Sequence, residues 1–423
     1  MPATADTPQA TRAATAGSTI TRDMFASLAN PNYRRYISGQ AVSLAGTWMQ
    51  VIAQSWLVLQ LTGAPTAIGA VVALQMLPVL VLGPYAGVVA DRVDKRRFMI
   101  ALQSTMGGLA VALGLLVITG FVQLWHVCVL ALLLGLTTCF EIPVRQAFVL
   151  EIVGPGHLRN AVSLNSVLAN AARAVGPAIA GIVIAAGGIG LCFLLNAASF
   201  VAVVASLVRL DTAALTPTVP TRRAPGQLRE GLRYVLGEPL LAVPLTMMAL
   251  VGCLAYEFQV VLPVVAQDTF GGDARTYGFL TAAMGLGAVV GGLLVAARGR
   301  TGLRALALAA LAFGMAMAIV ACAPNLAVAV VGMALVGAAG VAFLAMGNST
   351  LQLAAAPAMR GRVMALWAVA FLGSTPIGGP IAGAVSQAWG GRAGLALGAA
   401  ACLTAALMGL VVLRRARAGD VTT

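Results

Sequence analysis

Gly87-Val-Val-Ala-Asp-Arg-Val-Asp-Lys-Arg-Arg97 is the stretch that decides the fold, because a long apolar run ends here and six charged residues follow. The apolar run is about 20 residues long, which is enough for one helix to cross a bilayer. Gly87 leaves room for a second helix to approach closely. Asp91 can then face the positive N-terminal dipole of that helix. We therefore expect a charged clasp at a membrane surface, able to open and close.

The composition predicts an integral membrane protein. Of the 423 residues, 60% are hydrophobic and only 9% are charged, which is too apolar for a single water-soluble core. The apolar runs are long and continuous, unlike the alternating segments of about ten residues in a β-barrel. The sequence therefore predicts an all-α membrane protein with twelve transmembrane helices, at residues 36–61, 66–90, 98–120, 123–145, 161–187, 189–209, 240–265, 276–297, 303–323, 325–350, 361–388 and 391–413.

The positive charge reports topology rather than a polyanionic partner. The net charge is +13, but all except three of the 26 Lys and Arg residues fall in segments on one side of the twelve predicted spans. The exceptions are Arg173, Arg275 and Arg392. Cytoplasmic loops of membrane proteins are enriched in Lys and Arg. We therefore expect both termini in the cytoplasm and no nucleic-acid partner.

A long polar break divides the chain into two bundles of six helices. In this break Leu228, Leu232 and Val235 alternate with charged residues, a pattern typical of a short helix on the cytoplasmic leaflet. The N-terminal residues lack the basic and apolar regions of a signal peptide and are expected to be disordered. The predicted divisions are a tail at 1–33, a bundle at 34–210, a linker at 211–239, a second bundle at 240–414 and a tail at 415–423.

Residues that build catalytic or metal centres are scarce. The six cysteines lie in predicted spans without CxxC spacing, and His126 and His157 are the only histidines. The single lysine, Lys95, lacks the Gly and Ser/Thr neighbours of a P-loop. We therefore expect no enzyme activity, no cofactor and no bound metal. A membrane-embedded transferase is the less favoured alternative, since it needs clustered His or Asp ligands.

The first span carries a polar stripe at helical spacing. Gln40, Ser43, Thr47, Gln50 and Gln54 recur at steps of three and four, which places them on one face of a helix. Lipid cannot satisfy these side chains. The stripe is therefore expected to line a substrate cavity, with hydrogen bonding between helices as the alternative.

A second stripe lies on the fifth span, where Ser163, Ser166, Asn170 and Arg173 share a face. At 1.5 Å per residue, Arg173 lies ~18 Å from the cytoplasmic end of its helix, near the middle of the bilayer. An arginine at that depth costs about 2.5–3.5 kcal/mol on insertion scales. Either a buried ion pair or a role in binding substrate or coupling protons is expected to compensate it.

Two acids have functional interpretations. Glu257, in a Tyr-Glu-Phe-Gln segment of the seventh span, is surrounded by apolar sequence. Burial without a partner would allow it to exchange protons near neutrality; a pair with Arg173 or a hydrogen bond between helices is the alternative. Glu141 and Arg145 are spaced to pair on one helix, either as a local ion pair or as a cytoplasmic gate.

An internal repeat relates the two halves. A shift of 203 residues, from 159 to 362, sets Arg159 on Arg362 and Gly176-Pro177 on Gly379-Pro380. The fifth and eleventh spans are therefore candidate copies. Related halves of this kind hold the binding site between them near the midplane, and rocking of one half on the other is the transport motion.

The opening stretch resembles the loop between helices two and three of the major facilitator superfamily, whose pattern is Gly-x-x-x-Asp-Arg-x-Gly-Arg/Lys-Arg/Lys. Asp94 stands at the second glycine of that pattern. The resemblance implies that Asp91 contacts the start of helix eleven, near Arg362 and Val363, when the cytoplasmic side is closed. The predicted cytoplasmic gate comprises Gly87, Asp91, Arg92, Lys95, Arg96, Arg145 and Arg362.

Three further segments resemble the bacterial drug and siderophore exporter branch, which includes the enterobactin exporter and macrolide efflux proteins. The segments are Pro143-x-Arg145-Gln-Ala, Arg173-Ala-Val-Gly-Pro177 and Phe193-Leu-Leu-Asn-Ala-x-Ser-Phe200. Thr47 follows Gly46 where related exporters often have an acid, and this leaves Glu257 and Glu141 as the candidates for proton coupling. The antiporter pattern of helix five has its Gly-Pro core here but lacks further glycines, with Ser163 and Ala172 in their places.

The resemblance implies a proton-coupled antiporter that exports amphipathic small molecules by alternating access, driven by the proton gradient. We expect a monomer in the bacterial cytoplasmic membrane, with the small-molecule substrate, protons and lipid as its partners. A uniporter or importer of a small metabolite is the alternative. Apolar cavity walls favour a lipophilic cation or zwitterion as substrate, and a bulky siderophore fits nearly as well.

Overall fold

The structure is a computed structural model that describes residues 26–216, 227–299, 301–357 and 359–419. The regular elements among these residues are helices. They are η1 Ala26–Ala29, α2 Pro31–Thr62, α3 Pro65–Arg92, α4 Lys95–Ile118, α5 Leu124–Gly187, α6 Ile189–Val208, η2 Thr212–Ala214, α7 Gln227–Leu236, α8 Pro239–Ala255, α9 Phe258–Val264, η3 Val265–Thr269, α10 Ala274–Arg298, α11 Leu303–Ala321, α12 Leu326–Ala354, α13 Arg360–Leu372, α14 Thr375–Trp389 and α15 Gly391–Gly419.

The membrane-crossing helices agree with the predicted number. Eleven segments of the described chain are long and apolar enough to cross a bilayer, but α5 has 64 residues, or ~96 Å at 1.5 Å per residue. It bends at Gly154, whose φ of 69° suits a glycine. Gly190, just after α5, lies against Ile118, just before it, so both ends of α5 are at the same end of the molecule. α5 thus supplies two crossings.

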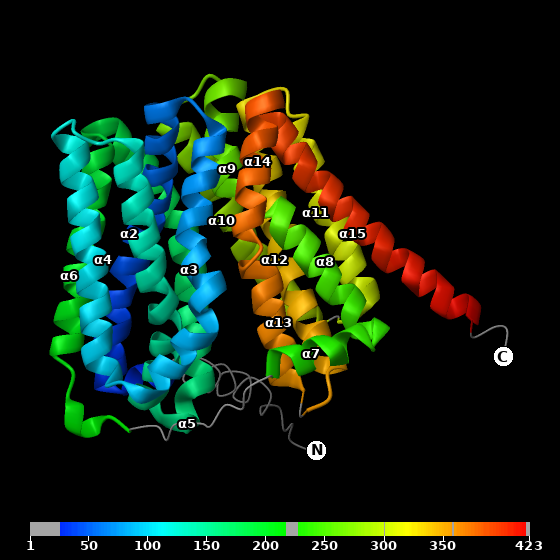
Figure 1. Cartoon of the computed structure of the whole chain (residues 1–423), viewed down its shortest axis with the longest axis horizontal. Helices are drawn as coiled ribbons and strands as arrows, with labels where there is room; N and C mark the ends of the chain where they lie inside the picture. The colour runs from blue at the N-terminus through cyan, green and yellow to red at the C-terminus, as the bar shows by residue number, and fades with distance from the viewer. Residues whose placement is uncertain (1–25, 217–226, 300, 358, 420–423) are drawn as a thin grey trace, which may run out of the picture.

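The helices form two groups that stand side by side. Helices α2–α6 pack mainly on one another, at the left of Figure 1, and α8–α15 do the same at the right. α7 lies at the bottom of Figure 1, and we call this end of the molecule the linker end. The top, where α2 joins α3, is called the loop end. Towards the linker end the two groups diverge in this view.

Two helix pairs make most of the contact between the groups: α5 with α10, and α3 with α14. Both seams are backbone contacts through glycine. A Cβ atom on Gly278 of α10 would lie 2.5 Å from the Pro177 carbonyl oxygen, and one on Gly383 of α14 would lie 2.8 Å from the Pro65 carbonyl oxygen. The carbonyl of Gly379 touches Gly69 in the same α3–α14 seam. The two repeated Gly-Pro pairs therefore occupy corresponding places, one in each seam.

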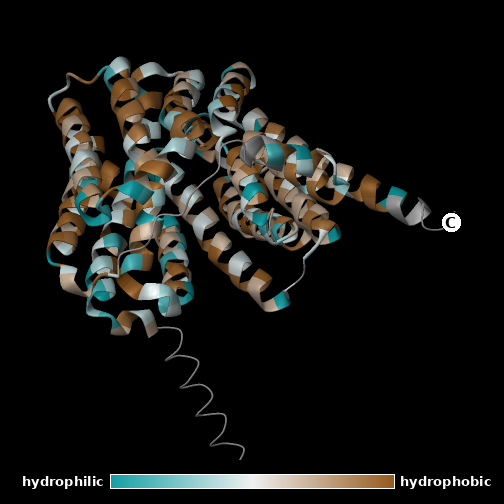
Figure 2. Cartoon of the chain, turned by 60° about the horizontal axis from the view of Figure 1, so that its bottom comes forward, coloured by the Kyte–Doolittle hydropathy of each residue, from teal (hydrophilic) through white to brown (hydrophobic). Residues whose placement is uncertain are grey.

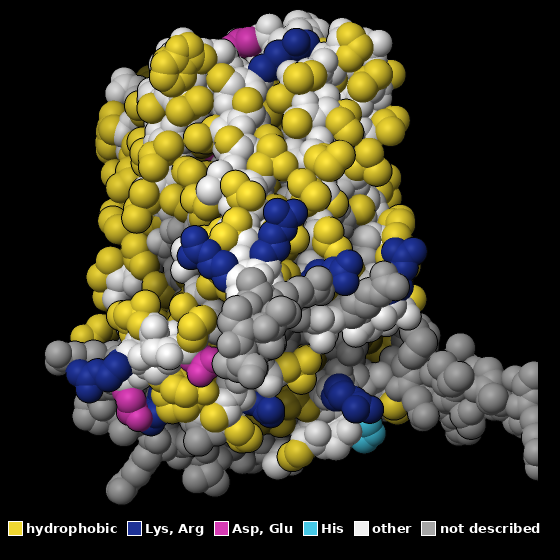
Figure 3. Space-filling model, turned by 90° about the vertical axis from the view of Figure 1, so that its right-hand side faces the viewer, with side chains coloured by type: hydrophobic (Ala, Val, Ile, Leu, Met, Phe, Trp, Pro, Cys, Tyr) yellow, Lys and Arg dark blue, Asp and Glu magenta, His cyan; other side chains and the backbone are white. Residues whose placement is uncertain are grey.

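The outer surface suits a lipid environment. Large apolar side chains such as Val81, Leu293 and Leu407 are exposed. Figure 2 shows apolar residues along the helices, with hydrophilic residues near the end turned forward. In Figure 3, apolar side chains cover the upper part of the face, whereas Lys and Arg gather towards the linker end. This distribution matches the predicted charge asymmetry; the orientation of the termini stays a prediction.

The N-terminal tail is shorter than predicted. Residues 1–25 lie outside the described chain, but residues 26–33 form η1 and the start of α2. The hydroxyl of Ser27 donates to Asn160 Oδ1 at 2.6 Å. The side chain of Asn30 caps α2 and donates to the Ile152 carbonyl at 2.7 Å. These bonds hold the segment against the bend of α5, so the prediction of disorder to residue 33 was wrong for residues 26–33.

The other end of the chain also keeps more regular structure than predicted. α15 continues beyond residue 414 to Gly419, because residues 415–418 are arginine and alanine, which favour helix. In the linker, α7 covers Gln227–Leu236 and buries Val235, while Leu232 stays exposed. α7 packs on α13, so the predicted surface helix is present and rests on the second group of helices.

Candidate functional site

A cavity lies between the two groups of helices. Its walls come from α2 and α5 of the first group and from α9–α12 of the second. It encloses about 80 Å³, whereas one water needs ~10–15 Å³ on this measure, so it can hold several waters. The aromatic and polar residues that line it are Trp48, Arg173, Tyr256, Phe258, Gln259, Tyr277, Thr281 and Phe313.

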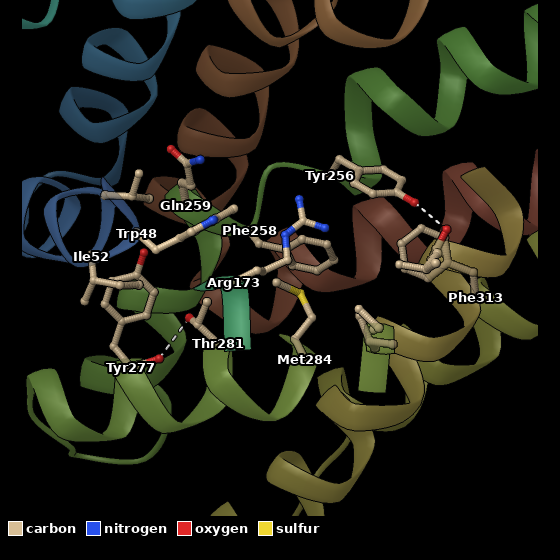
Figure 4. A pocket seen from close by; sticks show the side chains of 16 residues that line it. Trp48, Ile52, Arg173, Tyr256, Phe258, Gln259, Tyr277, Thr281, Met284 and Phe313 are labelled. Atoms are coloured by element: carbon tan, nitrogen blue, oxygen red, sulfur yellow. Dashed lines mark hydrogen bonds between the residues drawn. The ribbon is translucent and has the colours of Figure 1, made fainter. Parts of the chain in front are cut away.

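Arg173 is the one cation that lines this cavity. Its Cζ atom lies 5.0 Å from the centre of the Trp48 ring, within the range of a cation–π contact. Figure 4 shows the side chain in the cavity, between Trp48 and Tyr256. Among the described residues none forms an ion pair or hydrogen bond with the guanidinium. The predicted mid-bilayer arginine is therefore without the acidic partner that a structural role would give it.

The aromatic wall depends on a break between α8 and α9 at Tyr256 and Glu257. The Tyr256 ring lies 5.3 Å from the Phe313 ring and 4.8 Å from the Phe371 ring, both measured between centroids. Its hydroxyl donates to the Gly340 carbonyl at 2.7 Å. These contacts fix Tyr256 towards the cavity. The break turns the next residue, Glu257, away from it.

Glu257 lies behind the α3–α14 seam and is 4% exposed. Its Oε1 is 2.9 Å from the position of a Cβ atom on Gly378, and its Oε2 is 3.6 Å from that of Gly379. The Thr375 hydroxyl is its hydrogen-bonding neighbour on α14, and no charged side chain of the described residues acts on it. Oε1 has no hydrogen-bond partner in this part of the chain. Glu257 and Arg173 therefore do not form the ion pair that was the alternative prediction.

The polar stripe of α2 faces other helices instead of the cavity. Gln50 Oε1 accepts from Asn196 Nδ2 of α6 at 2.5 Å. Gln54 Nε2 donates to Gln75 Oε1 of α3 at 2.9 Å. The neighbouring face of α2, with Trp48, lines the cavity. At both glutamines the structure therefore agrees with the alternative prediction, in which the stripe forms hydrogen bonds between helices.

The rest of that stripe is satisfied within α2. Gln40 Nε2 donates to the Tyr36 hydroxyl at 2.9 Å, and the Thr47 hydroxyl donates to the Ser43 carbonyl at 2.9 Å. Gln40 and Ser43 are buried. Thr47 is exposed, and none of Gln40, Ser43 and Thr47 lines the cavity described above. The role of these residues in lining a substrate cavity stays a prediction.

The stripe on α5 leads towards Arg173. Asn170 is one turn closer to the linker end, and its side-chain amide donates to the Ser166 carbonyl at 2.9 Å. The hydroxyls of Ser163 and Ser166 bond to carbonyls one turn earlier and are exposed. Asn170 is not a lining residue of the cavity. It belongs to a polar face of α5 that runs from the linker end up to the cavity.

The departure at Asp94 from the superfamily loop has a structural reason. Asp94 is the N-cap of α4, and its carboxylate accepts from the Arg97 backbone N–H at 2.9 Å. Arg96 follows on this helix and donates to the carbonyls of Leu207 and Val208, both at 2.9 Å. The loop therefore caps two helices, α4 and α6. A glycine at position 94 has no side chain and could not accept the hydrogen bond from the Arg97 N–H.

Other residues of the predicted gate are tied within the first group. Lys95 Nζ lies 2.8 Å from Glu151 Oε1, and both residues are buried. Gly87 is buried in α3. The side chains of Asp91 and Arg92 make no ion pair or hydrogen bond with any residue in the described part of the chain. The predicted contact of Asp91 with helix eleven is therefore not formed in this conformation.

The remaining gate residues form separate pairs. Arg362 Nη1 lies 2.6 Å from Glu230 Oε1 of α7, so it faces the linker. Arg145 Nε lies 3.0 Å from Glu141 Oε1, and Gln103 Nε2 is 3.5 Å from the same oxygen. Glu141 is buried within the first group. In this conformation Glu141 and Arg145 therefore form a local ion pair on one helix.

The chain as a whole matches one family model. The model is described as transmembrane secretion effector and covers residues 22–422. The chain belongs to this family of the major facilitator superfamily. Its members are transporters, not enzymes, and this agrees with a cavity between two groups of membrane helices.

The chain is similar in sequence, at modest identity, to several bacterial transporters. The multidrug efflux pump Tap of Mycolicibacterium fortuitum is 28% identical over 82% of this chain and 87% of its own. The enterobactin exporter EntS of Shigella boydii serotype 4 is 27% identical over 82% of each chain. The staphyloferrin A transporter of Staphylococcus aureus is 26% identical over 62% of this chain. The chain spans 66% of the length of that last relative and about half that of the MFS-type transporter YfiS of Bacillus subtilis.

Solved structures support the same fold. The nucleoside transporter NupG superimposes with a TM-score of 0.72 at 14% identity, over 90% of this chain and 98% of its own. A bacterial homologue of the iron transporter ferroportin gives a TM-score of 0.70 at 14% identity, with the same coverage. The predicted major facilitator fold is therefore confirmed.

Proposed function

We propose that this transporter exports amphipathic small molecules across the bacterial cytoplasmic membrane by proton-driven antiport, as a monomer with both termini in the cytoplasm. The observation that carries the proposal is the cavity between two groups of helices that are joined by close backbone seams at the loop end and diverge at the linker end. Relatives named as exporters of drugs and enterobactin support outward transport. The halves would rock about the seams, exposing the cavity to each side in turn.

We propose Glu257 as the residue that carries the coupled proton. A charged carboxylate is costly to bury without a cation, so we expect Glu257 to be protonated while the α3–α14 seam is closed. Opening that seam would hydrate the carboxyl group and let it exchange its proton with the loop-end side. The other titratable group near it is Cys253, which lies on α8 just before the break. Proton binding and seam closure would therefore be linked at one residue.

Glu141 is the weaker candidate. It pairs with Arg145 and contacts Gln103 inside the first group, away from the seams. We therefore assign it to holding α5 at its linker-end half.

Transport of a permanently charged probe in vesicles tests the proposal. Inverted vesicles with an acidic interior should accumulate naphthalene-2-sulfonate or trimethyl(2-naphthyl)ammonium, and collapse of the pH gradient should stop the accumulation. Right-side-out vesicles should not accumulate either probe under the opposite gradient. Gradient-driven uptake into right-side-out vesicles would favour the importer alternative, and equilibration without any gradient dependence would favour a uniporter.

A further inference from the structure

We infer that the transported molecule carries an acidic group that Arg173 binds, so the substrates are aromatic or amphipathic organic anions. The inference rests on the proposed transport function and names its substrate class. It replaces the lipophilic cation that the apolar sequence of the spans suggested. Four features of the cavity support it.

The first feature is the charge of the cavity. Arg173 lines it, and no Asp or Glu does so. Glu257, which lies between the lining residues Tyr256 and Phe258 in sequence, faces Gly378 and Gly379 instead of the cavity. A cationic ligand would meet an uncompensated positive charge, whereas an anion would neutralise it.

The second feature is the free donor face of the guanidinium. Trp48 covers a face of the planar group at 5.0 Å, and a cation–π contact leaves the N–H donors at its edge unused. No described residue accepts from these donors. A guanidinium edge matches the geometry of a carboxylate or sulfonate, which accepts two parallel hydrogen bonds.

The third feature is the state of the other polar groups in the cavity. The Tyr256 hydroxyl donates to the Gly340 carbonyl, and the Thr281 hydroxyl donates to the Tyr277 carbonyl at 3.0 Å. The side-chain amide of Gln259 makes no hydrogen bond within the described chain and lines the same cavity as Arg173. The donors left for a ligand are therefore the Arg173 guanidinium, the Gln259 amide and the Trp48 indole N–H, which have no acceptor in the described chain, and such donors bind anions.

The fourth feature is the shape of the walls. Rings of Trp48, Tyr256, Phe258 and Phe313 line the same cavity as the guanidinium, and such rings stack on flat apolar groups. The polar face of α5 with Asn170 and Ser166 runs from the linker end to Arg173. An acidic head group can travel along this face while the apolar part of the molecule follows the aromatic wall.

Equilibrium binding of a matched probe series tests the inference. The probes are naphthalene-2-sulfonate, naphthalene-2-sulfonamide and trimethyl(2-naphthyl)ammonium, titrated by calorimetry into the full-length protein in lipid nanodiscs. The wild type should bind the sulfonate ~10-fold or more tightly than the ammonium ion, which corresponds to ~1.4 kcal/mol. Arg173→Gln should remove this preference, Arg173→Lys should keep part of it, and Arg173→Glu should reverse it.

A matched control is Arg275→Gln, which removes an exposed arginine at the start of α10 without touching the cavity. It should bind the three probes as the wild type does. Retention of the sulfonate preference by Arg173→Gln would overturn the inference, and so would a wild type that prefers the ammonium ion or binds no sulfonate. Should Arg173→Glu fail to fold, the Gln and Lys variants still decide. Binding at equilibrium is independent of direction and coupling, so the vesicle experiments can fail while this preference stands.

Discussion

The two ends of the molecule are held by different kinds of contact. At the loop end, the halves meet through backbone, with Gly278 against the Pro177 carbonyl and Gly383 against the Pro65 carbonyl. At the linker end, charged side chains dominate, and each ion pair of the described residues there stays within one half or joins a half to the linker. The loop end is thus closed by the close packing of helix backbones at glycines. The linker end holds charges that can exchange partners.

The contrast has consequences for how each end tolerates change. A backbone contact has no side chain that can move aside, so an added methyl group must displace a helix. An exposed ion pair contributes only ~0–1 kcal/mol and gives way easily. We therefore expect substitutions in the seams to have the largest effects and substitutions of the exposed charges the smallest.

The largest effect is expected for Gly278→Ala in the α5–α10 seam. Its new Cβ atom would lie 2.5 Å from the Pro177 carbonyl oxygen, so the seam cannot close as it does in the wild type. We expect a loss of ~10–100-fold in the transport rate, equivalent to ~1.4–2.7 kcal/mol, together with a lower unfolding temperature. Uptake into proteoliposomes and thermal unfolding in detergent measure the two.

Gly108→Ala is the matched control. Gly108 is also helical, but nothing lies within 4 Å of the position its Cβ atom would take. Normal transport is expected for this variant. If both alanine variants transported equally well, the close approach of α5 and α10 would not be needed for closure.

Glu257→Gln tests the one titratable group in the α3–α14 seam. The amide imitates the protonated acid, so the seam should close normally while proton exchange is lost. We expect gradient-driven accumulation of the probe to fall ~10-fold or more and exchange of probe across the membrane without a gradient to continue. Asp268→Asn, at an exposed position further along the same span, should behave as the wild type. Undiminished gradient-driven accumulation in Glu257→Gln would remove this residue from the coupling mechanism.

Asp91→Asn addresses the linker end. Asp91 has no partner among the described residues in this conformation, so its loss should change the stability by less than ~0.5 kcal/mol. Transport should nevertheless fall, because the predicted clasp to helix eleven forms only when that end closes. Asp94→Asn serves as the control, since Asn caps a helix about as well as Asp. Normal efflux by Asp91→Asn would exclude the clasp, whereas reduced membrane abundance would point to a structural role.

The sequence was sufficient for the fold and for the two isolated charges. Twelve apolar spans follow from length and hydropathy, and the repeated Gly-Pro pairs fall in equivalent seams because glycine leaves room for close approach. Arg173 and Glu257 were identifiable because a charged residue in an apolar span is conspicuous. Their surroundings were not, since an apolar residue that faces lipid, core or cavity has the same pattern.

The aromatic wall illustrates this limit. Trp48 and Phe313 line the cavity, but nothing in the sequence separates them from aromatic residues in the core. The polar residues of α2 show the same limit, because Gln50 and Gln54 bond to Asn196 and Gln75 on adjacent helices. A hydrogen-bonding partner 146 positions away is a tertiary fact, and helical spacing alone cannot supply it.

A small effect on stability is also expected for Glu230→Gln. Its pair with Arg362 is short, at 2.6 Å, but the Glu230 side chain is 61% exposed, so we expect a loss of ~0–1 kcal/mol. The effect on conformation should be larger than this figure suggests, because the change frees Arg362 at the start of the helix that Asp91 is predicted to contact. The distance between spin labels on α3 and α13 at the linker end should then shift towards shorter values, and the double variant Glu230→Gln/Asp91→Asn should lose that shift. A distance distribution identical to that of the wild type would mean that Glu230 does not hold the linker end open, and the contrast between the two ends would then rest on the seams alone.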